Sequence, residues 1–282
     1  MLWDMMKGFL ESWFNYPGLA WYLILVSIGL AVVFGVIWLL GHQPPLVKKP
    51  GLWLVAIFSA FLTILAMTFV QIPLQYYYGQ AIESTLSQNT IADLLLLVGI
   101  PTVLISGLVQ EGAKMIPMVF WWWRSGKKLD PKTGLIIGAL AGAGFGIFEA
   151  VWVHNQVFMV GWTWEYVNYG GIEALIPFWE RFWSVASHIA VSAIAGYGLA
   201  KGKGFQFYLV ASVLHSIVNY LTILYAKGVI TTNQLEVILA AFAALIMLAA
   251  LWLRWRKDKE APATPVEAVE PTVPDIPAGP DD

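Results

Sequence analysis

Four ionisable residues lie inside long apolar segments of the sequence: Glu111, Glu149, His188 and His215. An ionisable side chain at membrane depth is costly, so it usually faces the protein interior or water and marks a functional site. Carboxylates and imidazoles can take a proton from water, stabilise a charged intermediate or bind a metal ion. The chain has no cysteine, which excludes thiolate nucleophiles, Cys-bound zinc and iron–sulfur clusters. Its chemistry must therefore use histidines, carboxylates or hydroxyl groups.

Most of these residues have polar companions on the same helix face, because residues three or four apart lie on one side of a helix. The companions are Lys114 for Glu111, Ser184 and Ser192 for His188, and Ser212 and Asn219 for His215. Lys114 is predicted to be a counter-ion for Glu111, and Ser192 to hydrogen-bond a carbonyl of its own helix. Glycines at positions 134, 138, 142 and 146 form a ridge that lets a neighbouring helix come close, one turn before Glu149.

The rest of the sequence must hold these groups in a membrane. Apolar residues make up 59% of the 282 residues and charged residues only 12%, against about 25% in soluble domains. A helix needs roughly 20 mostly apolar residues to cross the hydrocarbon core. The sequence therefore predicts an all-α, polytopic bundle with seven spans, near residues 18–40, 52–72, 91–123, 134–157, 179–200, 205–226 and 235–253. The third is long and contains Pro101, which predicts a tilted, kinked or partly re-entrant crossing.

The loop charges predict an orientation. Lys and Arg cluster after the first, third, fifth and seventh spans, whereas loops 73–90 and 158–178 contain neither. Short cytoplasmic loops are enriched in these residues, so the N-terminus is predicted outside and the C-terminus inside. Residues 1–17 are predicted to be an interfacial helix, 18–257 the transmembrane domain with a catalytic-like core at 91–226, and 258–282 a disordered, acidic, Pro-rich cytoplasmic tail. We expect an integral protein of a prokaryotic plasma membrane.

The helical rise places the four ionisable residues about 15–22 Å from the basic ends of their spans, which is compatible with one shared layer. They are therefore predicted to converge on one pocket. His42 and His154, near span ends, are predicted to be solvent or interfacial residues. Arg181, at the start of the fifth span, is predicted to extend outward rather than brace the pocket.

Four motifs occur in order on separate predicted helices: Gln110-Glu111-x-x-Lys114, Phe145-x-x-x-Glu149, His188-x-x-x-Ser192-x-x-x-Gly196 and His215-x-x-x-Asn219. This series resembles the PrsW-like and YhfC-like intramembrane proteases, members of the wider group of CAAX-processing and bacteriocin-processing membrane proteases. The resemblance covers the third to sixth spans, about half of the chain. It departs from the family in one place, because the first motif usually has two adjacent glutamates and Gln110 takes the first position here.

The resemblance implies an intramembrane protease of the glutamic or metallo type. Its catalytic residues would be Glu111, Glu149, His188 and His215, supported by Lys114, Ser192, Asn219 and Gln110. In a glutamic mechanism, Glu111 or Glu149 takes a proton from water, and the histidines with Asn219 orient the water and stabilise the oxyanion. In a metal mechanism some of the four bind zinc, so the cofactor is either none or zinc. The partners would be the lipid bilayer and a membrane protein or lipidated peptide substrate, and no nucleic acid.

Two other functions would use the same polar layer. The Gln110 departure leaves a catalytically inactive membrane scaffold of the same fold as the first alternative. A small-solute or proton transporter is the second alternative, because proton relays use the same Glu and His residues. Many transporters contain internal repeats, and the two halves of this sequence show no convincing one. The protease is therefore the preferred prediction.

Overall fold

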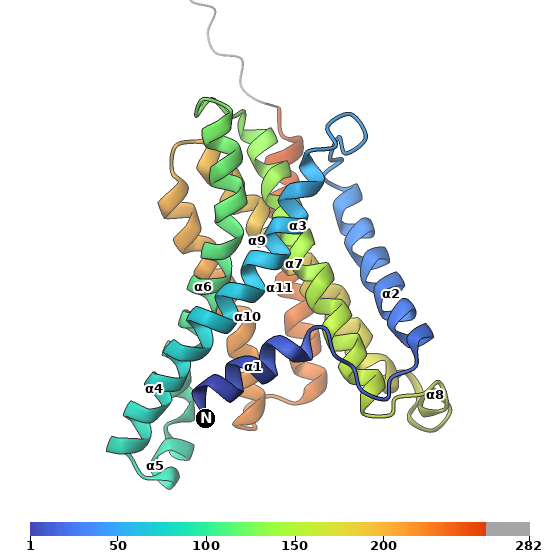
Figure 1. Ribbon diagram of the computed structural model, residues 1–282, viewed down its shortest axis with the longest axis vertical. Coiled ribbons are helices and arrows are strands. Elements are labelled where there is room, and N and C mark those ends of the chain that lie inside the picture. The colour runs from blue at the N-terminus through green and yellow to red at the C-terminus, as the bar shows by residue number, and fades with distance from the viewer. Residues whose placement is uncertain (258–282) are drawn as a thin grey trace, which may run out of the picture.

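The computed structural model describes residues 1–257, in which there are helices and turns and no strand. The predicted tail, 258–282, lies outside the described residues. Seven helical segments of the described chain are long and apolar enough to cross a membrane, which confirms the all-α polytopic prediction. They are α2 (Trp21–Leu40), α3 continued by α4 (Leu52–Thr85), α6 (Leu95–Arg124), α7 (Pro131–Met159), α8 continued by α9 (Glu165–Ala200), α10 (Gly204–Ala226) and α11 (Thr232–Trp255), as Figure 1 shows.

The loops that carry the clusters of Lys and Arg gather at one end of the bundle, at the top of Figure 1. The N-terminus lies toward the opposite end, and α11 finishes at the basic end. The alternation expected from the loop charges is therefore present in the arrangement of the helices. Which end faces the cytoplasm stays a prediction.

The second span is longer than predicted. A π-helical turn, η1 (Met67–Gln71), joins α3 (Leu52–Ala66) to α4 (Ile72–Thr85), so much of the expected loop 73–90 is helical. The wide turn ends two residues before Pro73 and includes Phe69, whose carbonyl the proline ring would crowd in a regular helix. The chain can thus continue as a helix through the proline.

The third span is also more regular than predicted. The short helix α5 (Gln88–Asp93) ends at Leu94, and α6 then runs as one helix that contains both Pro101 and Pro117. The re-entrant option for this segment is therefore wrong. With 30 residues, α6 is still longer than a straight crossing needs, so a tilt of this helix stays a prediction.

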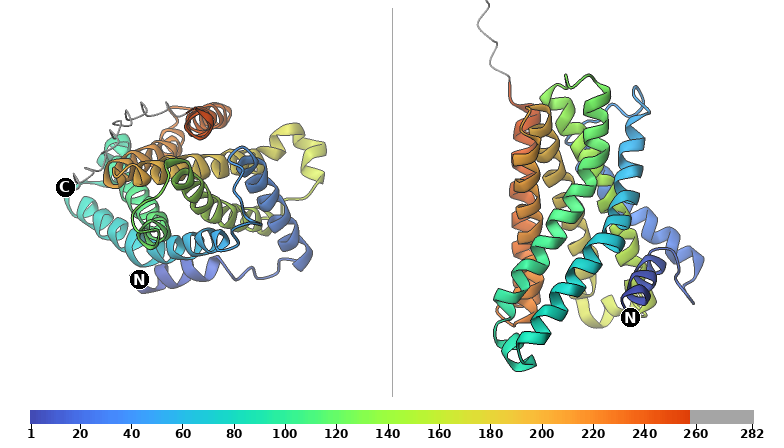
Figure 2. Two further views of the ribbon diagram at one scale, coloured as in Figure 1. Left: turned by 90° about the horizontal axis from the view of Figure 1, so that it is seen from above. Right: turned by 60° about the vertical axis from the view of Figure 1, so that its left-hand side comes forward.

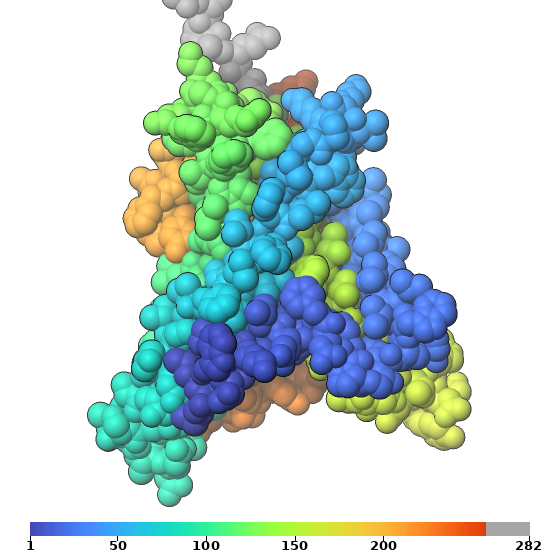
Figure 3. Space-filling view, in the orientation of Figure 1, coloured from blue at the N-terminus to red at the C-terminus, as the bar shows by residue number. Residues whose placement is uncertain are grey.

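Helix α1 (Leu2–Ser12) lies on the surface of the bundle, across the lower front of Figure 3 and against α4. Trp13, directly after it, is buried, and its ring stacks on Trp152 at 4.8 Å and on Phe148 at 5.7 Å between centroids. These aromatic contacts anchor α1 to α7. The interfacial position predicted for residues 1–17 stays a prediction.

Helix α7 runs through the middle of the bundle, and its most extensive neighbour is α9 (Ile176–Ala200), which follows α8 (Glu165–Gly170) and a 3-10 turn, η2 (Gly171–Leu175) (Figure 2). A Cβ atom built on Gly138 would lie 2.1 Å from the carbonyl oxygen of Ser192, and one on Gly142 would lie 2.1 Å from that of His188. The predicted glycine ridge is thus confirmed as a close contact between two helix backbones, and it seats α9 at the height of His188.

We expect Gly142→Ala to destabilise the protein by about 1–3 kcal/mol, because the new methyl group would overlap backbone that cannot turn aside as a side chain can. The matched control is Gly29→Ala in α2, where a Cβ meets no atom of the described chain within 4 Å. Alanine is also the better helix former, so the control should be neutral or slightly stabilising. Denaturant unfolding in detergent measures both variants, and equal stabilities would contradict the close contact.

Candidate active site

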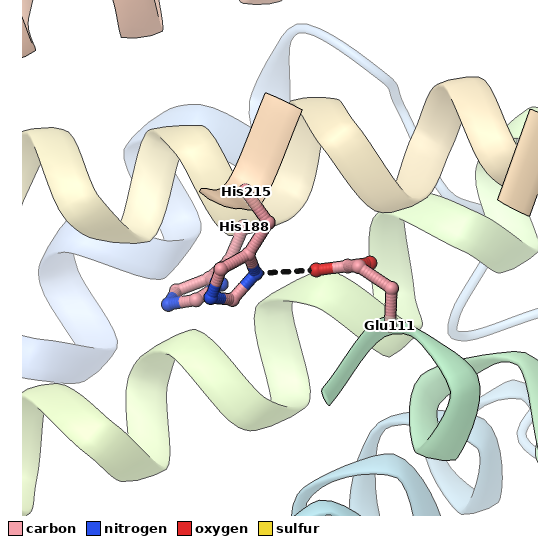
Figure 4. A group of neighbouring side chains, drawn as sticks. All are labelled: Glu111, His188 and His215. Atoms are coloured by element: carbon pink, nitrogen blue, oxygen red, sulfur yellow. Dashed lines mark hydrogen bonds and ion pairs between the residues drawn. The ribbon is translucent and has the colours of Figure 1, made fainter. Parts of the chain in front are cut away.

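A continuous line of ion pairs and hydrogen bonds joins the four predicted residues. Lys114 Nζ donates to Glu111 Oε1 at 2.7 Å, and His215 Nδ1 lies 2.7 Å from the same oxygen. Lys114 Nζ also lies 3.0 Å from His188 Nδ1, and His188 Nε2 lies 3.0 Å from Glu149 Oε2. Figure 4 shows the carboxylate of Glu111 directed at the two imidazoles. The structure therefore brings all four together around Lys114, which is the counter-ion that its spacing predicted.

Close helix contacts position these side chains. A Cβ atom on Gly107 of α6 would lie 2.3 Å from the carbonyl oxygen of Ser212 on α10. This contact is about one turn from both Glu111 and His215, so it brings the carboxylate and the imidazole within hydrogen-bond distance. The glycine ridge of α7 does the same for Glu149 and the histidine of α9.

The hydrogen bonds define which ring nitrogens carry hydrogen. The Lys114 ammonium can only donate, so His188 Nδ1 accepts and His188 Nε2 donates to Glu149. The Glu111 carboxylate accepts, so His215 Nδ1 is the donor. His215 Nε2 makes no hydrogen bond within residues 1–257, and it is the nitrogen that accepts a proton whenever the ring is neutral. Two carboxylate–histidine pairs result, one on each side of Lys114.

Arg181 braces the site, so the prediction that it extends outward is wrong. Its NH1 donates to Glu149 Oε2 at 3.0 Å, and its guanidinium also pairs with the neighbouring Glu180. Helix α9 begins at Ile176, earlier than predicted, and this places Arg181 inside the bundle with 13% of its side chain exposed. One sequence signal was available: Arg181 lies two turns before His188, and therefore on the same helix face.

The supporting residues surround the network. Ser192 Oγ donates to Glu111 Oε2 at 3.2 Å, and not to its own helix as predicted. Asn219 Nδ2 donates to Ser106 Oγ at 2.9 Å, and Gln110 Nε2 donates to the same oxygen at 3.0 Å. Sequence reasoning missed Ser106, although it lies four residues before Gln110 on the same face of α6.

The two remaining histidines are buried, which corrects their predicted solvent or interfacial placement. Nδ1 of His42 lies 3.3 Å from the Trp38 carbonyl oxygen. Burial, with a contribution from the nearby Arg254, lowers the pKa of His42 to about 4. His154 is enclosed because the rings of Phe34 and Phe178 pack against it, at 5.8 Å and 5.3 Å between centroids.

A cavity of about 110 Å³ opens beside the network. Since a water molecule takes up about 30 Å³ of liquid, the cavity has room for several. The cavity is lined by residues of the network, by Arg181 with its partner Glu180, and by apolar residues of α10 and α11. The lining includes Gln110, Glu149, Arg181, His188, His215, Asn219 and Leu239. Glu111 and Lys114 lie behind this lining, with 1% and 0% of their side chains exposed. Water can therefore meet His215 and Glu149 directly, and Glu111 only through His215.

Three of the residues also fit a metal ion. Glu111, His188 and His215 each offer one ligand atom, and these atoms lie within 4.8 Å of one another. One carboxylate oxygen with two imidazole nitrogens is a common ligand set of catalytic zinc. The contact between His188 and Glu149 matches the carboxylate that often orients a zinc-bound histidine. Lys114 contacts Glu111 and His188 at the same place, so a metal ion held by them would have to displace the ammonium.

Comparison with known families gives a match over most of the chain. The model of the PrsW-protease family, described as PrsW family intramembrane metalloprotease, matches residues 49–252. The matched region is well over half of the chain and contains every residue of the network and the cavity lining. No curated protein and no solved structure matches the chain.

Proposed function

The chain belongs to the PrsW family of intramembrane metalloproteases, and from this premise we propose that it hydrolyses peptide bonds of membrane-associated substrates with water held in the cavity beside His215. The observation that carries the proposal is the geometry of His215. Its Nδ1 is hydrogen-bonded to the buried carboxylate of Glu111, and its ring lines the cavity. A histidine oriented by a carboxylate in this way is a general base, as in hydrolases with a catalytic triad.

In a reaction without metal, His215 Nε2 takes a proton from water as the water oxygen attacks the peptide carbonyl carbon. The Glu111 carboxylate stabilises the imidazolium that forms. The oxyanion needs N–H donors, and Asn219 and Arg181 line the same cavity with N–H groups. His215 then returns the proton to the leaving amine, which completes the cleavage.

Zinc is the cofactor that the family and the ligand set favour, and Glu111, His188 and His215 are the residues that would hold it. When bound, zinc polarises the carbonyl and makes its water more acidic. Glu149, held in place by Arg181, would then be the carboxylate at the cavity that accepts a proton.

We expect a chelator to abolish cleavage and added zinc to restore it, because the three ligand atoms match a catalytic zinc site. The assay incubates the purified, detergent-solubilised protein with a library of transmembrane peptides, with and without chelator. Elemental analysis gives a second measurement, since His215→Ala should lower the zinc bound per chain. Cleavage that persists after chelation would assign the reaction to His215 and Glu111 without metal. An inactive scaffold or a transporter would leave every peptide uncut.

The protein is an integral membrane protein, and we further propose that its basic end faces the cytoplasm, following the loop charges. The cavity lining includes Thr222 and Leu235, which lie toward the opposite end of α10 and α11. In this orientation the cavity opens toward the outer side of the membrane. A prokaryotic plasma membrane stays a prediction.

A further inference from the structure

Three glutamines beside the ion network form a hydrogen-bonded line. Gln75 Nε2 donates to the carbonyl oxygen of Thr102 at 2.9 Å. Gln71 Nε2 donates to Gln75 Oε1 at 3.4 Å, and Gln110 Nε2 donates to Gln71 Oε1 at 3.1 Å. The second hydrogen of Gln110 Nε2 goes to Ser106 Oγ at 3.0 Å. The line therefore leads from a helix carbonyl of α6, through α4 and η1, to the cavity.

The direction of this line is fixed by its first member. A backbone carbonyl can only accept, so Gln75 must present its NH₂ group to Thr102 and its oxygen to Gln71. Gln71 must then give hydrogen to Gln75 and present its own oxygen to Gln110. Gln110 has to donate at that contact, which leaves its Oε1 as the end of the line.

The end of the line has no partner. Gln110 is 4% exposed, and its Oε1 makes no hydrogen bond within the described chain. A buried acceptor without a donor is costly, so native structures rarely keep one. Gln110 also lines the cavity beside His215 and Asn219. A buried acceptor without a partner thus lies at the wall of the cavity in which the proposed substrate would lie.

We infer that Gln110 Oε1 accepts a backbone N–H of the substrate, next to the peptide bond that is cut. This inference rests on the proposed protease function. A transmembrane segment must unwind locally before its backbone can be attacked, and each freed N–H then needs an acceptor because the membrane supplies none. The cavity offers donors for a substrate carbonyl in Arg181 and Asn219, and Gln110 offers the complementary acceptor.

The sequence around the line supports this role. Gln71 is the last residue of the π-turn η1, and such turns occur frequently at functional sites. Gln75 lies four residues later, so both amides face α6. A glutamate at position 110 could donate neither to Gln71 Oε1 nor to Ser106 Oγ when ionised. The replacement of the usual first glutamate by Gln110 therefore agrees with its amide neighbours.

The test uses a lysine-flanked alanine–leucine transmembrane peptide and a set of versions in which one backbone amide is replaced by an ester. An ester lacks the N–H and keeps the shape of the chain. Binding is measured with a fluorescent peptide in detergent, in a Glu111→Gln background that keeps the peptide whole, and cleavage is measured with Glu111 present. With Gln110 in place, we expect one ester position to bind about 10-fold more weakly than the amide.

Two variants of Gln110 separate its acceptor role from a structural one. Gln110→Met has a similar volume and no acceptor, so amide and ester should bind equally. Gln110→Glu keeps an acceptor toward the cavity, so the ester penalty should remain even if stability falls. Gln156→Met on α7, outside the cavity lining, is the matched control and should keep the penalty unchanged.

The outcomes distinguish this inference from the proposed function. An ester penalty that survives in Gln110→Met, or the absence of binding by every peptide, overturns the role of Gln110. If peptides are cut but no ester weakens binding in a way that depends on Gln110, the proposed protease function is supported and the role of Gln110 is wrong. If an ester weakens binding only when Gln110 is present and no peptide is ever cut, Gln110 is supported as an acceptor and the proposed protease function is contradicted.

Discussion

Replacing Glu111 by Gln should lower the rate of peptide cleavage by about 10²- to 10⁴-fold while the protein still folds. The amide can keep its oxygen at the Oε1 position for Lys114 and His215, and its NH₂ group then takes the Oε2 position, where Ser192 Oγ can accept instead of donate. It loses the charge that stabilises a protonated His215. In a serine protease, replacing the carboxylate that orients the catalytic histidine by an amide costs about 10⁴-fold. If Glu111 is a zinc ligand, the same substitution weakens the metal site.

Cleavage of a membrane-protein substrate is measured together with expression level and thermal stability. Glu83→Gln in the exposed part of α4 removes a carboxylate of the same type and should change neither. Glu149→Gln tests the second carboxylate, and His188→Ala and His215→Ala should abolish cleavage with some loss of stability. A substrate that all four site variants cut as fast as the parent would show that the active site lies elsewhere.

The sequence was sufficient to predict the seven spans and the residues that converge, because both leave strong local signals. Apolar length marks each span, and an ionisable residue within a span is rare enough to stand out. The glycine ridge predicted a close helix contact as well, since four glycines at one spacing can serve few other purposes. It did not say which helix would be the partner, because that depends on the whole bundle.

The features that were missed lack a local signal. Arg181 lay near a predicted span end, where a long basic side chain can reach either water or a buried acid, and its direction depends on where Glu149 lies in space. The hydrogen-bonded glutamines come from distant segments of the chain: Gln71 and Gln110, which are in contact, lie 39 residues apart in the sequence. One of them, Gln75, also stood in a segment expected to be a loop. Such pairings are set by tertiary packing and cannot be obtained from spacing along one helix.

Lys114→Met should destabilise the protein by about 3–5 kcal/mol, because it removes one partner of a fully buried ion pair and leaves the Glu111 charge uncompensated. Methionine fills a similar volume, so the loss reports the missing ammonium more than a cavity. Denaturant titration in detergent measures the change. Lys7→Met is the matched control, since Lys7 pairs with Glu11 at 3.7 Å on the exposed surface of α1. Such surface pairs contribute only about 0–1 kcal/mol.

A second variant distinguishes the charge from the packing. Lys114→Met combined with Glu111→Gln has neither charge, so it should recover a large part of the stability that Lys114→Met loses. In the double variant, the amide at position 111 can still hydrogen-bond Ser192 and His215 and carries no charge. In the single variant, the Glu111 carboxylate is still charged and has lost the ammonium that neutralised it. If the double variant is no more stable than the single one, the loss comes from packing around position 114. If Lys114→Met alone is as stable as the parent, the ion pair is not required for folding. A metal ion could then displace the Lys114 ammonium without loss of stability.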